Sequence, residues 1–311
     1  MPCGTEPQNL DNLLRPASRR PMHTETSVAP DPTPVAIITG GSAGLGLEIA
    51  RVFLGAGYRV AIIGRSEQRL AAAAEQLGQE ISSDPDRLDA YAGDLAIPST
   101  AAAILQRVVD RWGRIDVLVN NIGTSDRGSV DQLTAERLME LVGGNVIPML
   151  RTSQAALPYL EQSRGSILNI GSLAGKVGAR YLGAYPAAKH ALAGLTQQMR
   201  LEWKPRGVHV GLLSPGPIRR PDAGARYEHQ LGSQGSLPPQ ARLPGGGTRV
   251  RGQDPAKVAA RVLRMAQRRQ IDVLAPRYLR PLVAIGHLWP WFGDWLLLKL
   301  TSVKPPSSAK S

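Results

Sequence analysis

The sequence contains few of the residues that build disulfides and metal sites. Cys3 is the single cysteine among 311 residues, so no disulfide can form within the chain, and this fits a reducing compartment. The histidines are scattered, with no metal-ligand spacing among them, and we expect no metal site. They are His23, His190, His209, His229 and His287.

The N-terminal segment lacks the apolar run of a secretory signal. Asp11, Arg15, Arg19 and Arg20 interrupt every candidate stretch, so export is disfavoured and we expect a cytoplasmic protein. Residues 1–33 are rich in Pro, Ser, Thr and charge without sustained periodicity. This composition predicts a disordered leader.

Acidic residues are scarce in the C-terminal third. The net charge is +12, and residues 200–280 hold sixteen Lys or Arg against five Asp or Glu. A basic segment of this kind suits an anionic membrane surface, an acidic carrier protein or a phosphorylated substrate as a partner. It equally suits a surface that only keeps the protein soluble. No nucleic-acid-binding motif accompanies it, so no nucleic-acid partner is expected.

The sequence does contain a regular alternation of short apolar runs and longer helical segments. Hydrophobic residues make up 42% and charged residues 20% of the chain, as in soluble globular proteins. The runs are 35–39, 59–63, 88–92, 117–120, 166–170, 208–213 and 271–274, and the helical segments are 46–55, 67–78, 99–112, 135–160, 187–203 and 255–269. Strand then helix, repeated, predicts an α/β fold: a doubly wound parallel sheet (Rossmann fold) of about seven strands in a single domain spanning 34–276.

Two stretches break this rhythm. Residues 217–254 are rich in Gly, Pro and Arg, and a loop of that length in a compact domain predicts a substrate lid or an insertion. Residues 277–311 form a hydrophobic, Trp-rich C-terminal extension.

A glycine-rich turn joins the first expected strand to the first expected helix. Free N–H groups and the helix dipole attract a pyrophosphate at such a point, and glycine lets the phosphates approach. An ordinary tight turn is the alternative, which the strand before it and the helix after it disfavour. The turn reads Thr39-Gly40-Gly41-Ser42-Ala43-Gly44-Leu45-Gly46.

The second expected strand lacks the acid that an NAD enzyme places at its end to hold the ribose 2′-hydroxyl. The strand ends at Gly64, and Arg65 follows it. Because arginine attracts a 2′-phosphate, we expect NADP(H) as the cofactor. A solvated Arg65 at the start of a helix is the alternative.

A tyrosine and a lysine with helical spacing predict a catalytic centre. Tyr185 and Lys189 stand four residues apart, so both side chains project from one helix face. Such a pair is common by chance, but Ser172 lies thirteen residues upstream, just past the fifth expected strand, and Asn145 lies forty residues upstream. Pro186 fits the first turn of a helix, where its missing N–H has no partner anyway.

The turn and these spacings resemble the short-chain dehydrogenase/reductase family from Val35 to about Pro217. Ile122 replaces the alanine of the family's Asn-Asn-Ala-Gly, and Arg220 stands where the family usually has a threonine. The resemblance also implies a homo-oligomer, a dimer or a tetramer. It implies that the cofactor is bound by Gly40, Ser42, Gly44, Leu45, Gly46, Arg65, Asp94, Leu95, Asn121, Gly123, Tyr185, Lys189, Pro215, Gly216 and Ile218.

Catalytic roles follow from the same resemblance and from what carbonyl reduction needs. Hydride transfer leaves negative charge on the carbonyl oxygen, so a positioned acid must supply a proton. Tyr185 is the expected acid, and the charge of Lys189 favours its phenolate. In the family, the lysine also holds the nicotinamide ribose, the counterpart of Ser172 hydrogen-bonds the substrate oxygen, and the counterpart of Asn145 anchors a water molecule.

These observations predict an NADP(H)-dependent oxidoreductase that reduces a ketone, or oxidises the matching secondary alcohol, on a hydrophobic substrate, with lipid-like molecules among the candidates. A catalytically silent NADP(H)-binding sensor is the main alternative. Intact Ser172, Tyr185 and Lys189 argue against it, since a sensor needs no proton donor.

The C-terminal extension leaves three interpretations open. Residues 282–300 are mostly apolar and hold Trp289, Trp291 and Trp295, but His287, Pro290 and Asp294 interrupt them, so a membrane span is disfavoured. A helix lying in the membrane interface is one interpretation, because tryptophans and flanking cations suit that position. A helix over the substrate mouth or against another subunit is the alternative.

Overall fold

A computed structural model describes Met1 and residues 33–81, 84–220, 241, 247–248 and 250–301. The chain divides into two units, Met1–Pro32 and Thr33–Ser311, and the fold below belongs to the second. The predicted leader, except for its two end residues, and most of the predicted lid at 217–254 lie outside the described residues.

A seven-stranded parallel sheet organises the second unit, which confirms the predicted fold class. The spatial order is β3-β2-β1-β4-β5-β6-β7, so the direction of winding reverses between β1 and β4, the switch point at which ligands bind in such sheets. The strands are β1 (Val35–Thr39), β2 (Arg59–Gly64), β3 (Leu88–Ala92), β4 (Val117–Asn120), β5 (Ser166–Ile170), β6 (His209–Pro215) and β7 (Asp272–Ala275).

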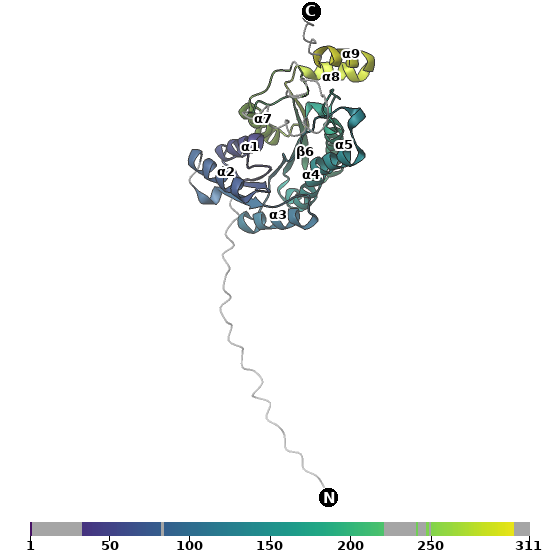
Figure 1. The fold of residues 1–311 in the computed structure, drawn as a ribbon. Helices are drawn as coiled ribbons and strands as arrows, with labels where there is room; N and C mark the ends of the chain where they lie inside the picture. The colour runs from purple at the N-terminus through teal and green to yellow at the C-terminus, as the bar shows by residue number, and fades with distance from the viewer. Residues whose placement is uncertain (2–32, 82–83, 221–240, 242–246, 249, 302–311) are drawn as a thin grey trace, which may run out of the picture. The chain divides into compact units, whose positions relative to one another are not determined.

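Helices cover both faces of the sheet, as Figure 1 shows. On one face lie α1 (Gly44–Gly55), α2 (Glu67–Glu80) and α7 (Pro255–Arg268), and on the other lie α3 (Pro98–Trp112), α4 (Ala135–Ser163) and α5 (Tyr185–Trp203). In β1, Val35 and Ile37 pack in the α3–α5 layer, whereas Ala36 and Ile38 pack in the α1–α7 layer. Successive strand residues face opposite sides, so a strand covered on both faces is apolar throughout.

The C-terminal extension forms two helices, whereas the sequence analysis expected one. They are α8 (Leu279–Leu288) and α9 (Pro290–Thr301), which lie together at one end of the unit (Figure 1). Pro290 has no N–H to continue α8, but it fits the first position of a new helix. The helices cross at Gly293, where a Cβ would lie only 2.8 Å from the Cα of Gly286. None of the described helices is long and apolar enough to cross a membrane.

Candidate active site

The glycine-rich turn forms a cradle between β1 and α1. The N–H groups of Gly40 and Gly41 donate to the carbonyl oxygen of Ile63 on β2, at 2.7 and 3.3 Å. A Cβ on Gly46 would lie 2.0 Å from the carbonyl oxygen of Gly40, so only glycine fits there. Ala43, the N-cap of α1, has no polar side chain to cap the helix, which leaves the first N–H groups of α1 for an anion.

Thr39 and Asn121 hold this turn against the end of β4. The Thr39 hydroxyl accepts from the backbone N–H of Asn121 at 2.9 Å, and the Asn121 amide donates to the carbonyl oxygens of Thr39 and Gly40 at 3.2 and 3.3 Å. The Asn121 side chain therefore braces the turn. Thr39 was missed as a site residue, although it begins the motif, because the glycines carry the sequence signal.

The adenine end of the predicted cofactor site lies at the carboxyl ends of β2 and β3. Arg65 is exposed directly after β2, and a Cβ on Gly64 would lie 3.4 Å from the Ser42 hydroxyl. After β3, the Asp94 carboxylate accepts from the N–H of Ala96 at 2.9 Å. The Leu95 side chain is buried in the core, so a contact of Leu95 with a cofactor would involve its backbone.

A cavity of about 230 Å³ brings the remaining predicted residues together. Ser172 lies at the N-cap of the 3-10 helix η3 (Leu173–Gly175), where its hydroxyl accepts from the N–H of Ala174 at 3.1 Å. Tyr185 and Lys189 project from the first turns of α5. The predicted residues in the cavity wall are Leu45, Asn121, Gly123, Ser172, Tyr185, Lys189, Pro215, Gly216 and Ile218.

Lys189 is a buried cation beside Tyr185. Its ammonium lies 5.8 Å from the centre of the Tyr185 ring and donates to the carbonyl oxygen of Ile170 at 3.2 Å. Only 4% of the residue is exposed, and this burial lowers the pKa of Lys189 to about 8 because the charged form loses its hydration. The lysine is therefore still mostly charged at pH 7.

We expect Lys189→Met to raise the free energy of unfolding at pH 7 by on the order of 1 kcal/mol, because it removes a buried charge. The pKa of Lys189 is about 8 in the folded chain, below the ordinary lysine value of 10.5 that applies in the unfolded chain. The folded wild type holds fewer protons than the unfolded chain between those values, so its stability rises with pH there. The difference in the free energy of unfolding between the variant and the wild type should therefore shrink from pH 8 to pH 10.

Denaturant unfolding of both proteins at pH 7 and pH 10 measures this difference. Lys204→Met on the exposed surface is the control and should show no such pH-dependent gain. A loss of stability in Lys189→Met at pH 7, or a gain that does not change with pH, would contradict the expectation.

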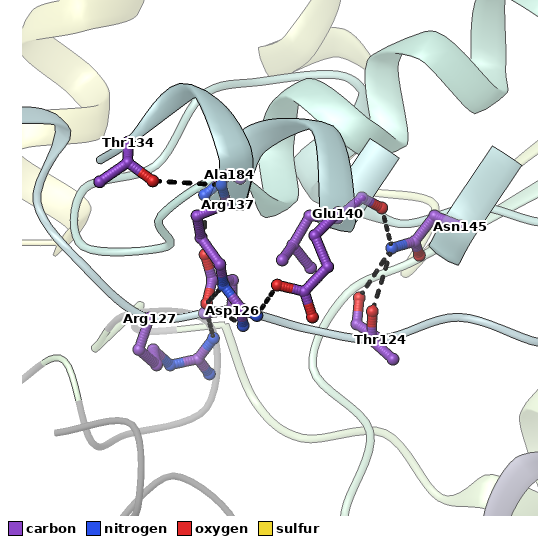
Figure 2. A network of polar contacts seen from close by, with 9 residues as sticks. Thr124, Asp126, Arg127, Thr134, Arg137, Glu140, Asn145 and Ala184 are labelled. Atoms are coloured by element: carbon purple, nitrogen blue, oxygen red, sulfur yellow. Dashed lines mark hydrogen bonds and ion pairs between the residues drawn. The ribbon is translucent and has the colours of Figure 1, made fainter. Parts of the chain in front are cut away.

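Asn145 lies within α4 and points toward the same centre. Its amide nitrogen donates to the carbonyl oxygens of Leu141 and Thr124, at 2.8 and 3.1 Å (Figure 2). Its Oδ1 is buried and has no hydrogen-bond partner among the described residues. A Cβ on Gly123 would lie 2.7 Å from this oxygen and 3.0 Å from the Lys189 ammonium. The two groups thus converge on one point, where the oxygen can accept a hydrogen bond.

Asp126 is a site residue that the sequence interpretation missed. Its carboxylate accepts from the backbone N–H of Ala184, directly before Tyr185, at 3.1 Å, and pairs with Arg137 at 2.8 Å (Figure 2). Asp126 is 2% exposed. It therefore ties the start of α5 to the segment after β4 and positions Tyr185. No local motif surrounds Asp126, so only the fold reveals this contact.

The C-terminal extension reaches the cavity. Leu297 and Thr301 of α9 lie in its wall, as does Arg220 after β6. The outer sides of α8 and α9 carry exposed Trp289, Trp291 and Trp295. Among the three interpretations of this segment, the structure thus favours a cover over the mouth, and its exposed face stays available for a second contact.

Known proteins are similar to this chain in sequence. Residues 34–231 match the family model of short chain dehydrogenases. Dehydrogenase/reductase SDR family member 7B of Danio rerio is 32% identical over 261 residues, covering 82% of this chain and 82% of the relative. Granaticin polyketide synthase putative ketoacyl reductase 1 of Streptomyces violaceoruber is 33% identical over 202 residues, covering 64% of this chain and 73% of the relative.

Solved structures show the same fold. A crystal structure of a variant actinorhodin polyketide ketoreductase with NADPH has a TM-score of 0.66 and 29% sequence identity, and the match covers 78% of this chain and 95% of that one. The family match extends from before β1 to beyond β6. The chain therefore belongs to the short-chain dehydrogenase/reductase family of oxidoreductases.

Proposed function

We propose that the protein is an NADP(H)-dependent oxidoreductase that interconverts a ketone and a secondary alcohol on a hydrophobic substrate. The observation that carries the proposal is the meeting of Ser172, Tyr185 and Lys189 in one cavity beside the glycine-rich turn. Relatives named as ketoacyl reductases and a ketoreductase structure with NADPH support it.

The residues present fit the cofactor. The uncapped start of α1 and the close approach at Gly46 suit a pyrophosphate. Arg65 and Ser42 lie where a 2′-phosphate would meet a cation and a hydroxyl donor. When bound, NADPH supplies a hydride, and every remaining step depends on the protein.

Tyr185 and Ser172 act on the substrate oxygen. The Tyr185 hydroxyl donates its proton to that oxygen as negative charge develops there, and the Ser172 hydroxyl donates a hydrogen bond to it. The neighbouring Lys189 ammonium stabilises the phenolate that remains. After the reaction the Lys189 ammonium gives a proton back to the phenolate. The Oδ1 of Asn145, next to Lys189, accepts a hydrogen bond from a water molecule, which then returns a proton to the lysine.

Oxidation of NADPH against a panel of aliphatic, cyclic and aromatic ketones, followed by absorbance, tests the proposal. We expect turnover with apolar ketones and little with small charged ones, because Leu173, Val177 and Leu182 line the cavity. Tight NADPH binding without turnover of any carbonyl would instead support the sensor alternative.

The predicted homo-oligomer stays a prediction, which light scattering of the purified protein would check.

The exposed face of α8 and α9 favours a further contact, with an anionic membrane surface. Trp289, Trp291 and Trp295 are 57%, 74% and 48% exposed, and Arg277 and Arg280 are exposed at the start of this segment. Tryptophans beside cations suit the membrane interface. We therefore propose that this face makes a peripheral contact with acidic lipids.

We expect the full-length protein to sediment with phosphatidylserine vesicles at low salt, and the triple replacement of Trp289, Trp291 and Trp295 by serine to reduce the bound fraction several-fold. Added salt should weaken binding, since exposed charges are screened over about 10 Å at 0.1 M. Met139→Ser, at an exposed apolar residue elsewhere, is the control. Wild-type protein that stays in the supernatant at low salt would rule out the contact.

A further inference from the structure

We propose that a second cavity, lined mainly by α8 and α9, binds a linear, uncharged hydrocarbon arm of the substrate whose carbonyl lies at Tyr185. This inference rests on the proposed function and names the class of substrate: a ketone on an aliphatic chain. The cavity has a volume of about 470 Å³, and we call it the tail cavity.

Hydrophobic side chains from several elements form the tail cavity. The cavity is a partly open cleft, since Leu282 in its wall is exposed, and mostly apolar clefts of this volume are typical of small-molecule sites. Its wall includes Leu279, Leu282 and Val283 of α8 and Leu296, Leu297 and Leu300 of α9.

The tail cavity adjoins the candidate active site directly. Leu173, Val177, Thr248, Leu297 and Thr301 line both cavities. Leu173 follows Ser172 in the chain, so the shared wall begins beside the hydroxyl that faces the substrate oxygen. A chain attached to a carbonyl at Tyr185 therefore enters the tail cavity on leaving the active site on this side.

Three polar side chains in the wall of the tail cavity are engaged with the protein, whereas Asp294, also in the wall, is exposed to solvent. The Lys176 ammonium pairs with Asp272 at 2.7 Å, and Nε2 of His287 lies 2.7 Å from the carbonyl oxygen of Lys176. Nδ1 of His190 lies 2.8 Å from the carbonyl oxygen of Pro186. An anionic ligand would have to break the Lys176 pair and would meet the Asp294 carboxylate, and the rest of the wall is mostly apolar, so the cavity favours an uncharged chain.

The test measures reduction of 2-alkanones of rising length, from 2-butanone to 2-dodecanone, by full-length protein with NADPH. In the wild type, kcat/KM should rise about two- to fourfold per added methylene, approaching the factor for burying a CH₂ group. Val283→Trp fills the tail cavity and should flatten this rise while leaving 2-butanone reduction within about twofold. Ala284→Trp, at an exposed neighbour on α8, should behave as the wild type.

A second measurement separates the inference from the proposed function. Calorimetric binding of 2-dodecanone to the NADPH-loaded protein should weaken at least about tenfold in Val283→Trp and not in Ala284→Trp. Val283→Phe is the smaller replacement, used if Val283→Trp does not fold. Binding that depends on Val283 without any turnover would refute the proposed reaction and keep the cavity assignment. Turnover with no dependence on chain length, or an equal dependence in Val283→Trp, would overturn the assignment and leave the proposed function standing.

Discussion

Tyr185→Phe is expected to lower the turnover of ketones at least about 100-fold, because a positioned general acid contributes a factor of that order or more. NADPH binding should stay within about threefold of the wild type, since the ring remains beside Lys189 and only the hydroxyl is removed. Steady-state NADPH oxidation and a fluorescence titration of the cofactor measure the two quantities separately.

The matched control for this variant is Tyr159→Phe. The Tyr159 hydroxyl bonds the Gln106 side chain at 2.8 Å on the exposed surface, so its loss should leave turnover unchanged. Near-normal turnover in Tyr185→Phe would show that another group supplies the proton. A fall in both turnover and cofactor binding would show instead that the hydroxyl organises the site.

Arg65→Asp is expected to weaken NADPH binding by a factor of about 10 to 100, the range for hydrogen bonds to a charged group. The replacement removes the cation directly after Gly64, whose Cβ position lies near the Ser42 hydroxyl, and places a carboxylate where the 2′-phosphate is expected. NADH has no such phosphate, so its affinity should hold or improve. The wild type should prefer NADPH, and the variant should lose or reverse that preference.

Titration of both cofactors against both proteins tests this expectation. Arg69→Asp introduces the same charge change four residues further on, at an exposed position of α2, and should shift the preference far less. Equal affinity of the wild type for NADPH and NADH would reject the role of Arg65. It would also leave the reaction at Tyr185 untouched, because the two sites are tested by different measurements.

The inner strands could be predicted closely from the sequence because they are buried on both faces, and the half-buried edge strand β3 was predicted as well. The expected runs 35–39, 88–92, 117–120 and 166–170 coincide with β1, β3, β4 and β5. Helix starts were less accurate: α5 begins at Tyr185, as Pro186 indicated, but α1 begins at Gly44, two residues before the expected start. Apolar periodicity fades in a first turn, where the unpaired N–H groups and not side-chain burial define the helix.

The site could be predicted where a single local motif carries the chemistry. Ser172, Tyr185 and Lys189 were expected together and do line one cavity. We did not expect the hydrogen bonds between Thr39 and Asn121, or the one by which Asp126 accepts from the N–H at the start of α5. These contacts join residues that are distant in the chain, and a lone polar residue has no pattern that marks its partner.

The sequence by itself determined the layered α/β architecture, the position of the glycine-rich turn and the side chains proposed to carry the reaction, since each depends on periodicity or short spacing. Only the tertiary structure decided how those groups are tuned and what covers them. The burial that lowers the pKa of Lys189 comes from the surrounding fold. The cover over the cavity comes from α9, which lies more than 100 residues beyond Tyr185 in the chain. Such segments are brought together by the burial of apolar surface. Because this interaction is not directional, no sequence motif marks the residues that will meet.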